Sequence, residues 1–278
     1  MSRSAIKEGT AFDAERTRQI IADFRRDGYC VIGGVLDRDE VAALRDATDH
    51  YMDDEAAMAR GYVERDHMLR HTNELDPIFL DLLAREPIYS LMETLFGENF
   101  QQCGANVLRS GRGVAIEHWH VDDGLFFPLP DDVPRHDPRI LMPVYWLTVQ
   151  MALSDIERIE HGPTQYVPGS HYSGRKAPDN GTPEFEGRGP ESIYCKAGDI
   201  YLHDPQCWHR GAPNNSDRVR YLLQSQYGAS WGFHRYNAYI RHSMPDELMD
   251  GADKRLRGLI GPQRRHPERR YTTDDYLD

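Results

Sequence analysis

Histidines and aspartates are concentrated in one short segment, EHWHVDDG at positions 117–124. If this segment begins as a β-strand, alternate side chains share a face, so His118, His120 and Asp122 would lie together. The Asp-Asp-Gly sequence that follows favours a turn, which would place His120 and Asp122 at a strand end. An imidazole and a carboxylate can bind one cation there, but two ligands leave its coordination incomplete and a third must come from elsewhere.

A third candidate, His209, lies much further along the chain, in the segment LHDPQCWHRGAPNNSDRVR at 202–220. Two histidines and one carboxylate from different strands can occupy one face of an octahedron and leave three positions for substrate atoms and O2. This 2-His-1-carboxylate arrangement is typical of non-haem Fe(II) oxygenases, whereas structural zinc sites close with four ligands, often thiolates. We therefore predict that His120, Asp122 and His209 bind Fe(II).

A 2-oxo acid cosubstrate would chelate the iron with one end and would need a fixed cation for its far carboxylate. Arginine suits that role because its planar guanidinium matches a carboxylate with two parallel hydrogen bonds. Arg218 and Arg220 both follow His209 and share one face of an extended strand, so alternation cannot choose between them. Arg220 lies deeper in the β-rich run VRYLLQSQY, and we therefore predict Arg220 as the anchor.

The elements that must position these residues change in character along the chain. Helix signals dominate the first hundred residues, including Asp13 before an apolar helical stripe that stops at Gly28, and a capping-box pattern of Asp37 with Glu40. After about residue 100, short β-rich runs alternate with turn clusters such as PLPDDVPRHDP, which favours a sandwich or barrel. We predict one domain, with a helical part at about 12–97, a β-core at about 100–230 and a C-terminal extension at 231–278.

The bulk composition excludes some classes of partner. The 278 residues carry a formal charge of −12, which disfavours binding to nucleic acid or to anionic lipid. The four cysteines are scattered without a C-x-x-C spacing, and no stretch approaches the roughly 18 apolar residues of a membrane span. We expect free thiols, a cytoplasmic location and a small-molecule substrate, while the oligomeric state is not indicated.

Several motifs occur in a characteristic order: FRRDGYCVIGGVLD at 24–37, WHVD at 119–122, ALSD with HGPTQYVPGSH within 152–171, and GDIYLHDPQCWHRGAPNNSDRVR at 198–220. The ordered set resembles the phytanoyl-CoA dioxygenase family, within the Fe(II)/2-oxoglutarate-dependent oxygenases, over about 12–230. The resemblance implies a mainly β fold with bracing α-helices, namely the double-stranded β-helix, a cupin-like jelly roll.

The resemblance also implies roles for individual residues. His120, Asp122 and His209 match the iron ligands, and Arg220 matches the anchor of the 2-oxoglutarate C5 carboxylate. Three further residues fall where members place a cosubstrate hydroxyl or pocket-lining strand side chains: Thr164, Gln102 and Gln150. Related halogenases replace the iron-binding carboxylate with a small residue; because Asp122 is retained, halogenation is not expected here.

The substrate is less well defined by the sequence. Residues that flank the motifs and could line its pocket are Arg109, Phe127, Trp231, Phe233 and Arg235. We expect O2-dependent hydroxylation of an unactivated C–H in a small organic metabolite, with release of succinate and CO2. The alternative is a non-oxygenase, such as a cupin-like metal-binding protein or isomerase with the same metal ligands. Arg220 separates the two, because the alternative has no need for a buried guanidinium at that spacing.

Overall fold

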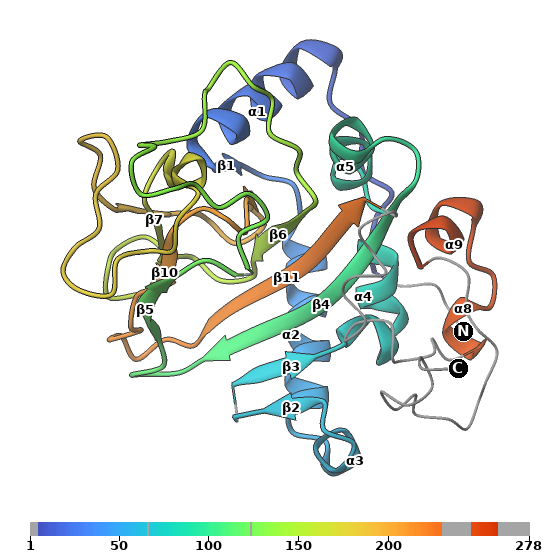
Figure 1. The fold of residues 1–278 in the computed structure, drawn as a ribbon. Coiled ribbons are helices and arrows are strands. Elements are labelled where there is room, and N and C mark those ends of the chain that lie inside the picture. The colour runs from blue at the N-terminus through green and yellow to red at the C-terminus, as the bar shows by residue number, and fades with distance from the viewer. Residues whose placement is uncertain (1–4, 66, 123, 230–245, 261–278) are drawn as a thin grey trace, which may run out of the picture.

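Two antiparallel β-sheets form the body of the protein in a computed structural model that describes residues 5–65, 67–122, 124–229 and 246–260 (Figure 1). The larger sheet has the strand order β1 (Tyr29–Ile32), β9 (Ile200–His203), β6 (Trp146–Ala152), β11 (Arg220–Ala229), β4 (Phe100–Ser110), β3 (Met68–Arg70) and β2 (Val63–Glu64). The smaller sheet has the order β5 (Ile116–His120), β10 (His209–Gly211), β7 (Thr164–Tyr166) and β8 (Glu191–Ser192). This arrangement confirms the predicted jelly roll.

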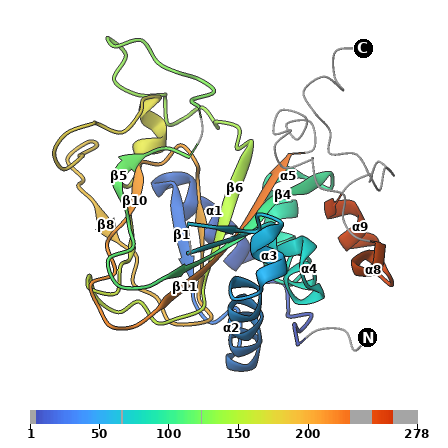
Figure 2. The ribbon, with the colours of Figure 1, turned by 90° about the horizontal axis from the view of Figure 1, so that it is seen from below.

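Helices cover the outer face of the larger sheet, on the side away from the smaller sheet (Figure 2). They are α1 (Ala14–Asp27), α2 (Arg38–Met52), α3 (Glu55–Ala59), α4 (Pro77–Leu82), α5 (Ile88–Phe96), α8 (Asp246–Met249) and α9 (Lys254–Ile260), with the 3-10 turn η1 (Thr72–Glu74). A second 3-10 turn, η2 (Ser170–Ser173), follows β7 of the smaller sheet in the chain. The predicted N-terminal caps are present: Asp13 caps α1, and Asp37 forms a reciprocal capping box with Glu40 at α2. Gly28 ends α1 with φ 84°, a left-handed conformation that favours glycine.

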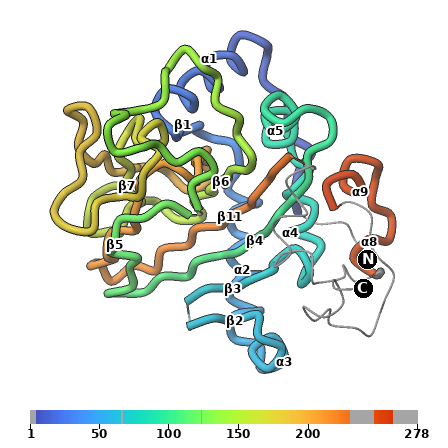
Figure 3. Tube along the Cα trace, viewed as in Figure 1, coloured from blue at the N-terminus to red at the C-terminus, as the bar shows by residue number. Residues whose placement is uncertain are grey.

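Strands β1, β2 and β3 lie within the part of the chain predicted to be helical, and they extend the larger sheet at both of its edges. The sequence predicted no strand at 63–70, where β2 and β3 form one edge of the sheet (Figure 3). The helical part is therefore joined to the β-core by strand pairing as well as by helix packing. Among the described residues, no helix is both long and apolar enough to span a lipid bilayer.

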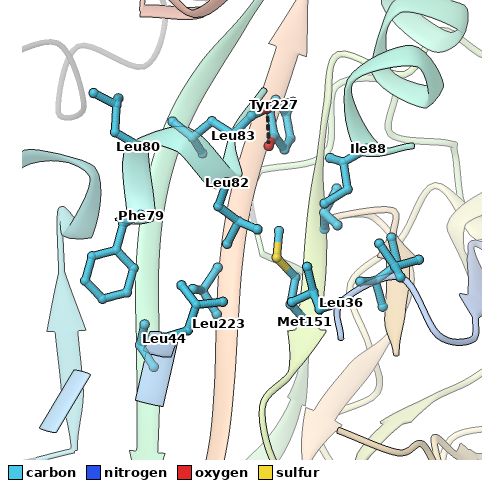
Figure 4. Close-up of a cluster of buried hydrophobic side chains, with 14 of the residues drawn as sticks. Leu36, Leu44, Phe79, Leu80, Leu82, Leu83, Ile88, Met151, Leu223 and Tyr227 are labelled. Atoms are coloured by element: carbon cyan, nitrogen blue, oxygen red, sulfur yellow. Dashed lines mark hydrogen bonds between the residues drawn. The ribbon is translucent and has the colours of Figure 1, made fainter. Parts of the chain in front are cut away.

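The two faces of the larger sheet bury different kinds of side chain. On the helix side, Leu223 of β11 packs with Leu44 of α2 and Leu82 of α4, and the Tyr227 hydroxyl donates to the Leu83 carbonyl at 3.1 Å (Figure 4). Because strand side chains alternate, the neighbouring Leu222 points the other way. It joins the residues between the two sheets, which we call the barrel interior: Leu108, Ala152, Tyr166, Tyr201 and Leu222, with others of the same cluster.

Candidate metal and cosubstrate site

Two of the predicted ligands face each other across neighbouring strands. His209 of β10 is paired with His120 of β5, and their ring centroids are 4.2 Å apart. The Nδ1 of His120 lies 3.0 Å from the His118 carbonyl oxygen, and the Nδ1 of His209 lies 2.9 Å from the Cys207 carbonyl oxygen. Since a carbonyl can only accept, each Nδ1 carries the proton and each Nε2 keeps its lone pair for a metal ion.

Asp122 completes a convergent group just beyond the end of β5. Its backbone N–H donates to the Pro205 carbonyl at 2.9 Å, which fixes the turn that presents its carboxylate. Its Oδ1 lies 3.3 Å from Nε2 of His209 and 3.8 Å from Nε2 of His120, and the three ligand atoms are all within 4.8 Å of one another. Ligands about 2.1 Å from an ion and at right angles to one another lie about 3 Å apart, so the group needs only a small contraction to bind a metal.

The charges at this group suit a cation. Burial raises the pKa of Asp122, but the neighbouring His209 and His203 outweigh it and hold the pKa well below its usual range. Burial and the nearby His209 lower the pKa of His120, so its imidazole is neutral at pH 7. Burial lowers the pKa of His209, but the adjacent Asp122 carboxylate raises it above its usual value. An ionised carboxylate and imidazoles that can lose their protons are the states that metal binding requires.

His203, which was not among the predicted site residues, also faces this group. It is 1% exposed on β9, its Nε2 lies 3.7 Å from Oδ2 of Asp122, and its ring centroid is 4.2 Å from that of His209. Neither ring nitrogen has a hydrogen-bond partner among the described residues, and burial lowers its pKa to about 3. The alternation of β9 could have found it, because Tyr201 and His203 share the face that looks into the barrel interior.

Arg220 is a buried cation for which the described residues provide no counter-charge. It opens β11, is 5% exposed and shares the interior face with Leu222. Its Nη1 donates to the Gly162 carbonyl and its Nη2 to Ser110 Oγ at 3.3 Å, while Nε has no partner and the guanidinium forms no ion pair within the described part of the chain. Burial lowers its pKa. A charged group buried without a partner is costly, so this position favours an anionic ligand.

Two other predicted cosubstrate residues face the barrel interior. Thr164 on β7 is buried, and its Oγ1 lies 2.9 Å from the hydroxyl oxygen of Tyr201, whose ring packs in the interior cluster. Gln150 on β6 is directly opposite Gln224, which donates to the Gln150 side-chain oxygen at 3.1 Å. The alternative anchor Arg218 has a side chain that is 53% exposed and lies 3.8 Å from Glu157, so it is a surface residue.

The placement of Gln102 does not support the predicted cosubstrate role. Gln102 is directly opposite Tyr227, whose side chain packs in the helix-side core, and opposite residues share a face. The β4–β11 register shifts between Gln226 and Tyr227, and this irregularity reverses the alternation beyond it. The side chain of Gln102 therefore points away from the barrel interior, which the regular alternation of side chains along a strand would not predict.

The predicted substrate residues are distributed differently. Arg109 lies on the helix side of β4, away from the barrel interior, and its guanidinium donates to Asp49 at 3.0 Å and to Asp53 at 2.8 Å. Phe127, 43% exposed, lines a pocket in the loop that follows Asp122. The remaining three lie outside the described residues: Trp231, Phe233 and Arg235.

Comparisons with known proteins agree with this architecture. The chain is 25% identical over 251 residues to the protein Rv1501 of Mycobacterium tuberculosis, covering 84% of this chain and 82% of that protein. The solved structure of SnoN, described as a non-heme alpha ketoglutarate dependent epimerase from nogalamycin biosynthesis, is 23% identical with a TM-score of 0.59, covering 78% of this chain and 84% of SnoN. HygX from Streptomyces hygroscopicus, solved with nickel and 2-oxoglutarate bound, is 18% identical with a TM-score of 0.61, covering 80% of this chain and 89% of HygX.

Residues 24–221 match the family model described as phytanoyl-CoA dioxygenase, which is well over half of the chain. The match begins at the end of α1 and runs through all three residues of the convergent group to the start of β11. It therefore spans both the elements that position the site and the side chains that form it. The chain belongs to the phytanoyl-CoA dioxygenase family.

Proposed function

We propose that the protein is an Fe(II)- and 2-oxoglutarate-dependent oxygenase that acts on a small organic molecule. The observation that carries this proposal is the joint presence, between the same two sheets, of a convergent His-Asp-His group and a buried guanidinium that has no counter-charge among the residues that the structure describes. The first would hold the metal ion and the second would hold a dicarboxylic cosubstrate. A metal site alone or a buried arginine alone would suit many kinds of protein, but together they match the two ends of one chelating anion.

The donor set fits ferrous iron. Two imidazole nitrogens and one carboxylate oxygen on one side leave the other positions open, which is the pattern of non-haem Fe(II) oxygenases. The HygX structure, which holds nickel and 2-oxoglutarate, supports a divalent metal and this cosubstrate for the same fold. When bound, Fe(II) with 2-oxoglutarate and O2 would supply the oxidising power to attack an unactivated C–H, with succinate and CO2 as by-products.

The residues of the chain would prepare this chemistry in three ways. The His118 and Cys207 carbonyls hold the two ligand imidazoles in the tautomer that presents Nε2. Arg220 would orient the cosubstrate by holding its far carboxylate with charge-assisted hydrogen bonds, beside the paired hydroxyls of Thr164 and Tyr201. The apolar residues of the barrel interior exclude water, which protects a reactive site from side reactions.

Hydroxylation is the outcome that we propose, because it needs only the oxidising centre and a positioned C–H bond. SnoN, described as an epimerase, shows that the fold also carries other outcomes. The non-oxygenase alternative is disfavoured by Arg220, since a metal-binding or isomerase protein gains nothing from an uncompensated buried cation, whose cost an anionic cosubstrate would relieve.

Anaerobic titration of the protein with Fe(II) and then 2-oxoglutarate tests the proposal. We expect a visible charge-transfer band in the parent protein, and weaker 2-oxoglutarate binding in Arg220→Gln, by roughly 30-fold or more, because a buried charge pair is lost. Arg218→Gln is the matched control, since it removes an exposed arginine close by on the same segment. Equal 2-oxoglutarate affinity in both variants, or no band in the parent protein, would contradict the proposal.

A further inference from the structure

A row of polar side chains crosses the interior face of the larger sheet, with one residue on each of five strands. It runs from Arg70 of β3 through Asn106 of β4, Gln224 of β11 and Gln150 of β6 to Tyr201 of β9, each directly opposite the next. Opposite residues share a face of a sheet, and Tyr201 packs in the barrel interior, so all five side chains lie on that side. The proposed function assigns no role to the first three.

Exposure to solvent increases from one end of this row to the other. Tyr201 and Gln150 are buried, Gln224 and Asn106 are half-buried, and the side chain of Arg70 is 42% exposed. The smaller sheet has four strands against seven in the larger one, and it leaves the β3–β4 side of the interior face uncovered. The barrel interior therefore opens to solvent on that side.

Strand β5, at the edge of the smaller sheet, borders the same opening. Residues 111–115 connect β4 directly to β5 (Figure 1). His118 shares the interior face of β5 with the predicted ligand His120, and their ring centroids are 4.8 Å apart, yet His118 is exposed. A molecule that enters between β4 and β5 would therefore meet His118 immediately beside the metal-binding group.

Gln224 lies on the interior face between the two ends of the proposed site. It is four residues from Arg220 on the same face of β11. The next residue on that face, Gln226, belongs to the cross-strand row that ends at His203, the neighbour of Asp122. A molecule at the opening would thus contact Gln224 while one of its C–H bonds faces the metal-binding group.

The Gln224 amide offers a ligand both a donor and an acceptor. Its Nε2 donates to Gln150 Oε1 at 3.1 Å, which holds the amide in one orientation. The second N–H and the Oε1 of Gln224 form no hydrogen bond with the residues that the structure describes. A neutral imidazole such as that of His118 also has one donor and one acceptor nitrogen. Hydroxyl groups complement such side chains, because each hydroxyl both donates and accepts.

The surroundings of Gln224 offer little to an apolar or a strongly charged ligand. In the neighbouring row of the interior face, Leu108 and Leu222 are only 5% and 2% exposed, so they present almost no apolar surface for a long acyl chain. At the rim, Arg70 is paired with Glu64 at 2.6 Å, and the pair carries no net charge. This pairing leaves no uncompensated cation for a phosphate or carboxylate group of the substrate.

We propose that the substrate enters between β4 and β5 and is a neutral polyhydroxylated ring, such as a sugar or a cyclitol, whose hydroxyl groups bind the Gln224 amide and the His118 imidazole. The inference rests on the proposed function, because it places the substrate beside the metal-binding group. Two hydrogen-bonding side chains on opposite sides of the opening fix the orientation of the ring. They thereby select which C–H bond faces the metal ion.

Paramagnetic NMR with a matched pair of probes tests this proposal. The probes are methyl β-D-glucopyranoside and methoxycyclohexane, which share a six-membered ring and a methoxy group and differ in their hydroxyl groups. With Mn(II) and 2-oxoglutarate bound under argon, we expect the full-length protein to broaden the glucoside signals and to bind methoxycyclohexane at least about 3- to 10-fold more weakly, as expected for one lost hydrogen bond. Broadening seen with Asp122→Ala is subtracted, because it reports Mn(II) free in solution.

Two variants then locate the glucoside. Gln224→Leu keeps the size of the side chain and should weaken glucoside binding about 3- to 10-fold, because it removes the amide. Gln165→Leu is the matched control and should bind as the parent protein does. Gln165 is a half-buried glutamine of β7 between the interior-facing Thr164 and Tyr166, so its side chain lies on the outer face.

Several results would overturn the proposal: equal or stronger binding of methoxycyclohexane by the parent protein, glucoside binding without Mn(II)-dependent broadening, no glucoside binding, or unchanged glucoside affinity in Gln224→Leu. Preferential binding of methyl β-D-glucuronide, which carries a carboxylate on the same ring, would also overturn it. Saturation-transfer NMR repeats the comparison of probes in the metal-free protein. A missing Fe(II)/2-oxoglutarate band would therefore count against the proposed function, whereas a missing preference for the glucoside would count against this inference.

Discussion

The second carboxylate oxygen of Asp122 faces His203, with Oδ2 and Nε2 3.7 Å apart, while its first oxygen faces His120 and His209. The two oxygens of one carboxylate are thus directed to different neighbours. A distance of 3.7 Å is longer than a hydrogen bond, but a small rotation of the carboxylate would close it. The arrangement assigns Oδ1 to the metal ion and gives His203 a positioning role.

Replacing His203 by phenylalanine should weaken metal binding by about 10-fold, because the carboxylate loses the polar neighbour that orients it. Phenylalanine keeps the volume of the buried ring, which limits damage to packing. The affinity for Mn(II) or Fe(II) is measured by anaerobic calorimetry. His161→Asn is the control, since His161 is also buried but lies away from the metal site, in contact with Arg158. An unchanged affinity in His203→Phe would contradict the positioning role.

Glu40→Ala should lower the free energy of unfolding by about 3–5 kcal/mol, because it leaves the buried Arg85 guanidinium without its carboxylate. Arg85 donates to both Glu40 oxygens, at 2.7 and 2.8 Å, and Glu40 also completes the cap of α2. Urea denaturation measures the change. Glu15→Ala removes an exposed partner of Arg18 and should cost less than about 1 kcal/mol. Similar losses in the two variants would contradict this account of Glu40.

The contribution of Glu74 to stability should be lost as the pH rises between about 4.5 and 7. Burial raises the pKa of Glu74 from 4.5 to about 7 in the folded protein. A raised pKa means that the folded state holds the proton more tightly, so this contribution is full below pH 4.5 and is lost as the pH rises through 7. Its size is up to about 3 kcal/mol.

Glu74→Gln should remove this contribution, since the amide oxygen can still accept from the Tyr62 hydroxyl, as the carboxylate does at 3.2 Å. Thermal melting at a series of pH values, compared with Glu64→Gln at a half-exposed position, provides the measurement. If Glu74→Gln melts with the same pH dependence as the parent protein, the assignment to Glu74 is wrong.

Arg175→Met should loosen the loop at 128–138. The Arg175 guanidinium donates to the Pro130 carbonyl at 2.7 Å and the Pro134 carbonyl at 3.3 Å, and it also contacts the carbonyls of Asp131 and Val133. Methionine keeps much of the side-chain volume without the donors. Limited proteolysis should then cut faster within 128–138. Cleavage at the parent rate would show that the loop does not depend on these bonds.

The sequence predicted the convergent group because its residues obey local rules. A strand followed by a turn brings His120 and Asp122 to one end of a strand, and His209 follows a β-rich run of its own. The pairing of β5 with β10 brings His209 to His120 and Asp122, and it depends on contacts between segments far apart in the chain. It could be expected only from the family resemblance, not from periodicity.

The limits of prediction are equally specific. The alternation of side chains along a strand correctly places Arg220 on an interior face. It gives the wrong face for Gln102, because the register between β4 and β11 shifts before that residue. Arg109 lies close to the motifs in the sequence, and nothing local indicates that Asp49 of α2 and Asp53 at its C-terminal cap would be its partners. Alternation with Tyr201 along β9 turns His203 towards the barrel interior, but its position beside Asp122 emerges only when β9 is placed opposite the smaller sheet.

Labelled oxygen tests the central claim most directly. The protein is supplied with Fe(II), 2-oxoglutarate and 18O2, and the released succinate is analysed by mass spectrometry, with Asp122→Ala as the control for iron-dependent chemistry in solution. The account predicts succinate that carries one labelled oxygen atom from the parent protein, and none above background from Asp122→Ala. Unlabelled succinate, an absence of succinate from the iron-loaded parent protein, or equal release by both proteins would contradict it.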